Sequence, residues 1–369
     1  MSEVLEGRYE FITPENFARE QTRGMESPRG PLLIAGCRTS SLLVEAVVSQ
    51  YQRLLAKAGS NQKVAHLDGV DDAFTDSETR VRLDCHVGGC DVFLLQTLFD
   101  PRSPLGIDRH YMTFLIAARA FREHGASHVT GVLPYLAYAR QDKPTKFLRE
   151  PTTAKLMADL AIEAGIDRLI TWNPHSAQIR GFYGTIPVNV LESLSFFIDE
   201  FHRFRNREDV IAVAPDAGAS KLVTRFGRAL GLRCAIASKF RPRTEEAEIT
   251  EIIGDFTGKR VAIIIDDMIS SGGTIDALVR KLVDEKGIEE VHLGVSHSLC
   301  VGDACERLRH LHDSFRLHDM VVTDSVPQTE AVRSLSFVTI RPLADTLSRT
   351  INRVHYNRSV SEIFVPRSL

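Results

Sequence analysis

The sequence has no apolar run approaching the roughly 20 residues needed to cross a bilayer, and it has little excess charge of either sign. Its 369 residues include 45 lysines and arginines against 48 aspartates and glutamates, for a formal net charge of -3. We therefore expect neither a membrane nor a nucleic acid as a partner. Residues 1–17 lack a basic segment followed by an apolar one, so we expect no secretory signal.

Cysteine is scarce, and the cysteines are scattered. The chain has six, and none of them shows the C-x-x-C spacing of a metal or redox motif. Neither a disulfide framework nor a zinc site is expected from them. Reduced thiols are typical of the cytoplasm, where we expect this protein to act.

Short apolar runs alternate with helical patterns along most of the chain. Runs such as PLLIAG (31–36) and VAIII (261–265) have no polar alternation, which is typical of strands buried on both faces of a parallel sheet. Strand-helix alternation predicts an α/β protein with two tandem domains, each a mainly parallel sheet flanked by helices. We divide the chain into a polar extension (1–30), two domains (31–188 and 189–345), and a final helix and tail (346–369).

The stretch VAIIIDDMISSGGT, residues 261–274, carries the most chemistry. Asp266 and Asp267 follow an apolar strand, and the small residues Ser270, Ser271, Gly272, Gly273 and Thr274 lead into a helix. Free N–H groups at a helix start, with glycines that allow close approach, favour binding of a phosphate monoester. The two acids could accept hydrogen bonds from vicinal hydroxyls, directly or through Mg²⁺. Ribose 5-phosphate combines both features, whereas the alternative is a tight turn beside two solvated acids.

These residues resemble the ribose-phosphate loop of the type I phosphoribosyltransferase fold. The rest of the chain is similar to one family with that fold, the ribose-phosphate pyrophosphokinases, also called PRPP synthetases. Five further segments carry this resemblance in the family's order, namely FTDSETRV, GVLPYLAYARQDKPTKFLREPTTAKLMADL, NPHSAQIRGFY, VAPDAGASK and SKFRPR.

The resemblance implies an activity and the residues that support it. The family transfers the pyrophosphoryl group of ATP to the 1-hydroxyl of ribose 5-phosphate, using Mg²⁺, and produces PRPP and AMP. The positions that match its ATP-binding residues are Arg140, Gln141 and Asp142. His175 matches a residue that binds the metal and the phosphates, and Asp216 matches an acid beside them. Lys239 and Arg241 match the mobile catalytic loop, where their charges would stabilise the transition state.

A second ATP contact in the family crosses between subunits. Phe74, Asp76 and Glu78 match a hairpin that reaches the adenine bound by a neighbouring subunit, so the resemblance implies a homo-oligomer, a dimer or larger and possibly a hexamer. An aromatic face can stack on a base, and carboxylates can accept its amino group. Taken alone, the same residues also suit one face of an edge strand.

The chain departs from the family at several positions near the expected site. Ser270 stands in place of an aspartate, Asn173 and Pro174 in place of Asp-Leu, and Ala219 in place of a glycine, while Ser271 in place of a threonine is mild. Two alternatives therefore stay open. One is a phosphoribosyltransferase that consumes PRPP, and the other is a catalytically weak regulatory homologue that associates with a PRPP synthetase.

Overall fold

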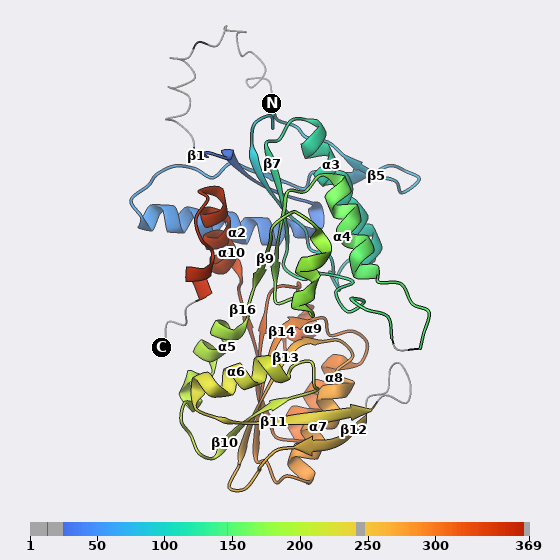
Figure 1. Ribbon diagram of the computed structural model, residues 1–369, viewed down its shortest axis with the longest axis vertical. Coiled ribbons are helices and arrows are strands. Elements are labelled where there is room, and N and C mark those ends of the chain that lie inside the picture. Colours follow the sequence, from blue (N-terminus) through green and yellow to red (C-terminus); the bar gives the residue numbers. More distant parts are fainter. Residues whose placement is uncertain (1–12, 14–24, 146, 241–247, 365–369) are drawn as a thin grey trace.

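The computed structural model of the chain describes residues 13, 25–145, 147–240 and 248–364. Figure 1 shows two α/β lobes stacked along the long axis of the molecule, the N-terminal one above and the C-terminal one below. The described residues form two seven-stranded sheets and a separate two-stranded hairpin. Both large sheets are mainly parallel and covered by helices, so the predicted fold class is confirmed.

The first sheet runs in the order β1-β2-β6-β7-β8-β9, with β3 paired to β2. All of its pairings are parallel except β1 with β2. Its strands are β1 (Glu26–Ser27), β2 (Gly30–Gly36), β3 (His66–Asp68), β6 (Asp91–Leu95), β7 (His128–Leu133), β8 (Arg168–Trp172) and β9 (Val188–Leu191). Strand β6 is wholly buried, as its apolar sequence predicts.

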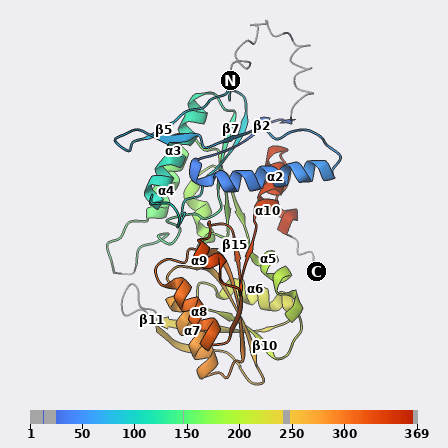
Figure 2. The ribbon, with the colours of Figure 1, turned by 180° about the vertical axis from the view of Figure 1, so that it is seen from behind.

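Helices cover both faces of this sheet, and one of them comes from the end of the chain. Helices α3 (Ile107–Glu123) and α4 (Thr153–Ala164) pack on one face. Helices α2 (Ser41–Lys57) and α10 (Ala344–His355) share the other core. Figures 1 and 2 both place α10 beside α2. The C-terminal helix therefore completes the core of the first lobe.

The second sheet runs in the order β12-β11-β10-β13-β14-β15-β16, and only the pairing of β11 with β12 is antiparallel. Its strands are β10 (Val210–Ala214), β11 (Arg233–Phe240), β12 (Glu248–Ile253), β13 (Val261–Ile269), β14 (Glu290–Ser298), β15 (Leu317–Thr323) and β16 (Val338–Arg341). Its helices are α5 (Leu194–Glu200), α6 (Ser220–Leu230), α7 (Gly273–Asp284), α8 (Ala304–Ser314) and α9 (Glu330–Arg333). Residues of α5 and α6 fill the core on one face, and residues of α7 and α8 fill it on the other.

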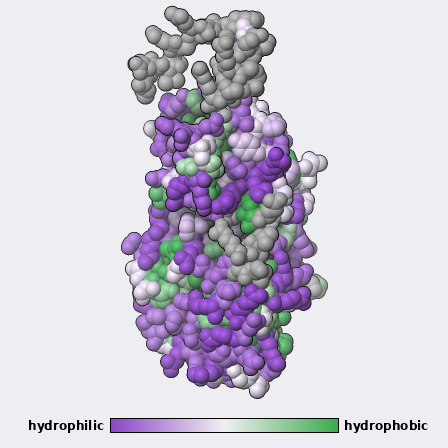
Figure 3. All heavy atoms as spheres, turned by 90° about the vertical axis from the view of Figure 1, so that its left-hand side faces the viewer, coloured by the Kyte–Doolittle hydropathy of each residue, from purple (hydrophilic) through white to green (hydrophobic). Residues whose placement is uncertain are grey.

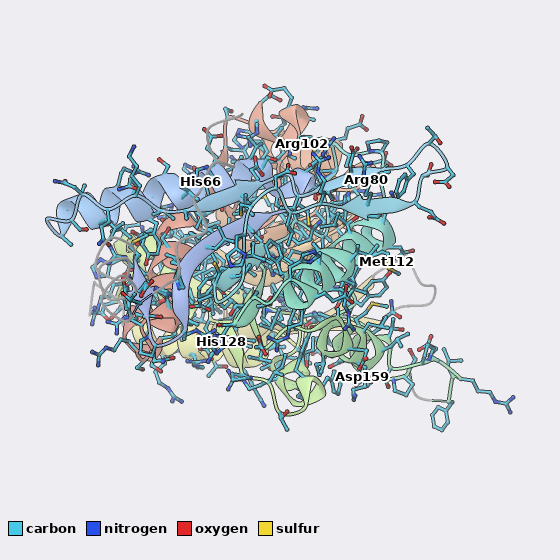
Figure 4. All side chains as sticks on the ribbon, turned by 90° about the horizontal axis from the view of Figure 1, so that it is seen from above. His66, Arg80, Arg102, Met112, His128 and Asp159 are labelled. Atoms are coloured by element: carbon cyan, nitrogen blue, oxygen red, sulfur yellow. The ribbon has the colours of Figure 1, made fainter. Side chains whose placement is uncertain are left out.

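A hairpin and several 3₁₀ turns complete the structure. Strands β4 (Asp71–Ala73) and β5 (Thr79–Val81) pair antiparallel. Figure 4 shows this hairpin, with Arg80 labelled, projecting from the body of the first lobe. The 3₁₀ turns are η1 (Arg38–Ser40), η2 (Ala177–Tyr183), η3 (His202–Phe204) and η4 (Ser361–Phe364).

The surface is mainly polar on the face drawn in Figure 3, where hydrophobic side chains form small separate groups. No helix within the described part of the chain has the length and apolarity that a bilayer crossing requires. All six cysteines are free thiols.

A buried histidine joins the two lobes. His297, on β14, has its Nε2 3.1 Å from the carbonyl oxygen of Asn173 and its Nδ1 2.8 Å from the Ser325 hydroxyl. The ring of Tyr135 packs edge-on against it, with centroids 5.2 Å apart. Burial lowers the pKa of His297 from 6.5 to about 4, despite the opposing effect of the Asn173 carbonyl. The native protein therefore keeps this imidazole neutral under mildly acidic conditions.

This shift predicts a loss of stability in acid. Below pH 6.5 the unfolded chain protonates His297, whereas the native state does so only near pH 4. Above pH 6.5 His297 is neutral in both states and adds no pH dependence. Between pH 6.5 and pH 4 its protonation in the unfolded chain lowers the free energy of unfolding by roughly 3 kcal/mol. Urea unfolding, followed by the fluorescence of the single tryptophan, Trp172, measures this loss. A His297→Gln variant is expected to lose less stability over the same range, and equal losses in the two proteins would contradict the assignment.

Candidate functional site

The acid pair lies on β13, just before the loop that leads to α7. Asp266 and Asp267 are half-buried, and β13 continues past them to Ile269. Strand β13 is parallel to β10 and β14, so its carboxyl end shares an edge of the sheet with theirs. Ligands bind at this edge in open α/β sheets.

The loop after β13 is shaped for an anion. Gly272 has a φ of +79°, a left-handed conformation that residues with a Cβ atom rarely adopt. It precedes the first residue of α7. The N–H groups in the first turn of a helix have no intrahelical partners, and the helix dipole adds positive potential there. A phosphate group can therefore be held by main-chain amides, with hydroxyls from the serine and threonine residues alongside.

Loop and acids share a cavity of about 670 Å³ with residues from both lobes. Arg140 and His175 reach it from the first lobe, and Asp216 reaches it from the turn between β10 and α6. Its remaining lining consists of residues 266–275 with Val301, Gly302, Asp303 and Arg307. The predicted ribose 5-phosphate residues, the predicted metal ligands and one predicted ATP residue are thus brought together.

His175 and Asp267 are in direct contact in this cavity. The Nδ1 atom of His175 lies 2.5 Å from Oδ2 of Asp267. The hydrogen bond that His175 donates to Asp267 raises the pKa of His175, although burial opposes it. Burial alone would raise the pKa of Asp267, but His175 outweighs it, and the net shift is downward. The pair is therefore stabilised as imidazolium and carboxylate across the two lobes.

The pKa of Asp266 is shifted in the opposite direction to that of Asp267. Burial first, and then the charges of Asp267 and Asp216, raise its pKa well above the ordinary value. Three carboxylates and an imidazole therefore lie close together, and the protein alone does not stabilise the negative charge of Asp266. Such a set of oxygen donors fits a divalent cation, which would restore the charged form of Asp266.

The other predicted ATP residues lie around this cavity or apart from it. Gln141 is fixed at the start of α4, because its Oε1 accepts a 2.5 Å hydrogen bond from the hydroxyl of Thr153. Asp142 is close enough for its charge to contribute to the raised pKa of His175. Phe74, Asp76 and Glu78 are exposed on the β4–β5 hairpin and do not line the cavity.

The predicted catalytic pair cannot be placed in this geometry. Lys239 lies near the end of β11, where only its backbone is described, and Arg241 lies outside the described residues. The pair therefore remains a prediction from the resemblance.

Sequence reasoning missed Arg307 and the loop of residues 301–303. Both line the cavity, and Arg307 comes from α8, one helix beyond the phosphate loop. A single arginine in an amphipathic helix carries no motif, so no signal in the sequence could have identified it. Its guanidinium adds a positive charge beside the loop.

Comparison with known proteins identifies the family. Residues 33–165 match the model of the N-terminal domain of ribose phosphate pyrophosphokinase, and residues 210–365 match that of the phosphoribosyl synthetase-associated domain. The ribose-phosphate pyrophosphokinase of Clostridium acetobutylicum is 37% identical over 79% of this chain and 87% of that protein. The Bacillus subtilis enzyme of the same name is 34% identical over the same shares. This chain belongs to the ribose-phosphate pyrophosphokinase family.

A solved structure agrees with this membership of the ribose-phosphate pyrophosphokinase family. The phosphoribosylpyrophosphate synthetase of Mycobacterium smegmatis is 30% identical, with a TM-score of 0.74, over 88% of this chain and 99% of that one. The similarity therefore includes both lobes. It also confirms the predicted pair of phosphoribosyltransferase-type domains.

The residues that depart from the ribose-phosphate pyrophosphokinase pattern occupy defined positions in the structure. Asn173 adopts a φ of +36°, and its side-chain amide donates a 2.7 Å hydrogen bond to the Ser296 hydroxyl of the second lobe. This bond fixes the segment that carries His175. Ala219 leaves the turn intact, because its N–H donates to Oδ1 of Asp216 at 3.2 Å. Ser270 lines the cavity without adding a negative charge.

Proposed function

We propose that the chain is an active ribose-phosphate pyrophosphokinase that transfers the pyrophosphoryl group of ATP to the 1-hydroxyl of ribose 5-phosphate, giving PRPP and AMP. The observation that carries this proposal is the shared cavity, where the anion-binding loop and the acid pair lie beside His175 and Arg140. The loop suits the 5-phosphate, and the acids suit the ring hydroxyls. The cationic groups suit the ATP phosphates.

The ligands would occupy opposite ends of this cavity. Main-chain amides of residues 270–274 would hold the sugar phosphate, and Asp266 and Asp267 would accept hydrogen bonds from the ribose hydroxyls. Arg140, Gln141 and Asp142 would position ATP on the side of the first lobe. The main contributions to catalysis would then be positioning and charge neutralisation, as in other phosphoryl transfers.

Mg²⁺ is the cofactor that we propose for this site, held by His175 and Asp216. With Nδ1 of His175 engaged by Asp267, its Nε2 would bind a metal after losing its proton, and the carboxylate would fix the ring. The ion would neutralise charge on the triphosphate.

One assay tests the activity and separates the alternatives. Purified protein is incubated with Mg²⁺, ATP and ribose 5-phosphate, and AMP is measured. AMP that forms only in the presence of ribose 5-phosphate supports the proposal. Consumption of PRPP with a nucleobase, without AMP formation, would indicate a phosphoribosyltransferase. Inactivity in both assays, together with binding to another PRPP synthetase, would indicate a regulatory homologue.

Lys239 tests the predicted catalytic loop. We expect Lys239→Ala to lower kcat at least ~100-fold, because an ammonium that stabilises transition-state charge contributes mainly to turnover. Steady-state kinetics with ATP varied separates kcat from KM. Lys57→Ala, at an exposed position of α2, serves as the control. Near-normal turnover of the Lys239 variant would exclude the residue from the mechanism.

We also propose that the protein acts as a homo-oligomer in the cytoplasm. The support for assembly is the β4–β5 hairpin, where Phe74 is 48% exposed and does not line the cavity of its own chain. The free thiols fit a reducing compartment. Sedimentation velocity is expected to show a dimer or a larger assembly, and a monomer at assay concentrations would remove the proposed intersubunit contact.

A further inference from the structure

A second group of metal-ligating side chains lies at the opposite end of the C-terminal sheet. Glu290 and His292 are at the start of β14, and His318 is at the start of β15, whereas the phosphate loop follows the end of β13. Within the described part of the chain, one ligand atom from each of these three residues lies within 4.8 Å of the others.

An irregularity in the sheet creates this group. Val291 pairs with Leu317, but His292 pairs with Asp319, so His318 is an extra residue without a partner in the ladder. Such bulges are rare between parallel strands, and they redirect side chains. Here the bulge brings Nδ1 of His318 within 4.0 Å of Oε1 of Glu290. The imidazole rings of His318 and His292 have centroids 5.2 Å apart.

The buried His292 is oriented as a metal ligand would be. It is 1% exposed, and its Nδ1 lies 2.8 Å from Oδ1 of Asp319. Arg203 in turn donates a 2.7 Å hydrogen bond to Oδ2 of Asp319. Histidines that bind metals usually donate their other ring N–H to a carboxylate, which fixes the ring. This arrangement directs Nε2 of His292 away from Asp319.

The remaining nitrogen faces a second carboxylate. Nε2 of His292 lies 2.7 Å from Oε1 of Glu290. When Nδ1–H donates to Asp319, Nε2 of a neutral imidazole is a lone-pair donor, which a carboxylate alone does not satisfy and a metal ion shared with Glu290 would, once the two side chains move apart. His318, whose side chain is 63% exposed, adds a further nitrogen with access from solvent.

We propose that Glu290, His292 and His318 bind one divalent transition-metal ion of the zinc class. Two imidazoles and one carboxylate are ligands that Zn²⁺ favours over Mg²⁺, and water would complete the coordination. With the metal on Nε2, the Nδ1–H of His292 would donate to Asp319 and hold the ring in place. The site joins the starts of β14 and β15, so its role is structural rather than catalytic.

No sequence motif marks this site. Glu290 and His292 are two residues apart and His318 is distant, so no spacing motif links them. The bulge that unites them is a property of the tertiary structure.

Zinc binding by the full chain tests the proposal. The protein is freed of metal with a chelator and titrated with Zn²⁺ in competition with a chromogenic chelator, with Co²⁺ absorption as the coordination signature. We expect His318→Ala to bind one equivalent fewer than wild type. Asp319→Asn, which removes the orienting carboxylate, should weaken the same equivalent by about 10- to 100-fold. His310→Ala, another exposed histidine of this lobe, is the control and should match wild type.

Two further variants distinguish this site from the catalytic cavity. Zinc bound by the cavity should persist in His318→Ala and be lost in His175→Ala. PRPP synthesis should be unchanged in His318→Ala, since the residue lies far from the phosphate loop. Equal zinc stoichiometry and affinity in wild type and His318→Ala would overturn the proposal and leave a hydrogen-bonded cluster without a metal.

Discussion

Replacing Asp266 and Asp267 together by asparagine is expected to lower kcat/KM for ribose 5-phosphate by about 100- to 10,000-fold. A hydrogen bond to a charged acceptor contributes about 1.5–3 kcal/mol, and two such bonds to the ring hydroxyls would be weakened. Each 1.36 kcal/mol corresponds to about tenfold in rate. Asparagine keeps the shape of the side chain, so the loss would report charge rather than packing.

The single variants should differ from each other. Asp267 carries the contact with His175, whereas burial and neighbouring charges favour the protonated form of Asp266 in the free protein. Asp267→Asn removes the carboxylate charge that helps raise the pKa of His175 and so weakens this contact between the lobes. We therefore expect Asp267→Asn to cost more activity than Asp266→Asn.

Steady-state kinetics with ribose 5-phosphate varied measures these losses. Asp284→Asn, at the exposed end of α7, makes the same chemical change outside the cavity and should retain wild-type kinetics. If the double variant kept kcat/KM within tenfold of wild type, the acids would not bind the sugar. A circular-dichroism melt of each variant separates lost binding from lost folding.

The parts of the site that could be predicted are those encoded locally. In residues 261–274 the strand, the acids, the glycines and the helix start are consecutive, so their order along the chain determines their order in space. The structure has β13 followed by α7 there, with Gly272 in the left-handed conformation at the junction. The wholly apolar strands likewise predicted sheets buried on both faces.

The parts that could not be predicted depend on contacts between distant segments. Helix α10 has an amphipathic pattern, but that pattern does not specify which lobe it covers, and it packs beside α2 of the first. His175 meets Asp267 across 92 positions of sequence. Arg307 reaches the cavity only because α8 follows the next strand of the same sheet. Each of these contacts follows from tertiary packing rather than from local pattern.

A buried charge network joins Arg29 and His355 to a strand of the first lobe. Asp91, at the start of β6, is 0% exposed. Its Oδ2 lies 3.0 Å from Nε of Arg29 and 2.8 Å from Nδ1 of His355, the last residue of α10. Removing the carboxylate leaves Arg29, which is 8% exposed, without its counter-charge. The network therefore couples the N-terminal segment and the C-terminal helix to one strand.

Asp91→Ala is expected to lower the free energy of unfolding by about 3–5 kcal/mol, because breaking a buried ion pair leaves an uncompensated charge. Urea unfolding measures this change through Trp172, which is buried in the core that α10 also fills. Glu289→Ala removes an exposed partner of Arg260 and should leave stability nearly unchanged.

A double variant identifies the source of this cost. Replacing the pair with apolar residues, as in Arg29→Met with Asp91→Leu, removes both charges and should recover part of the loss, because well-packed apolar residues often match a buried ion pair. Recovery would show that the unpaired charge, and not the lost hydrogen bonds, makes Asp91→Ala costly. If the double variant were as unstable as Asp91→Ala, the hydrogen bonds that hold the β1–β2 turn, β6 and α10 together would carry the stability instead.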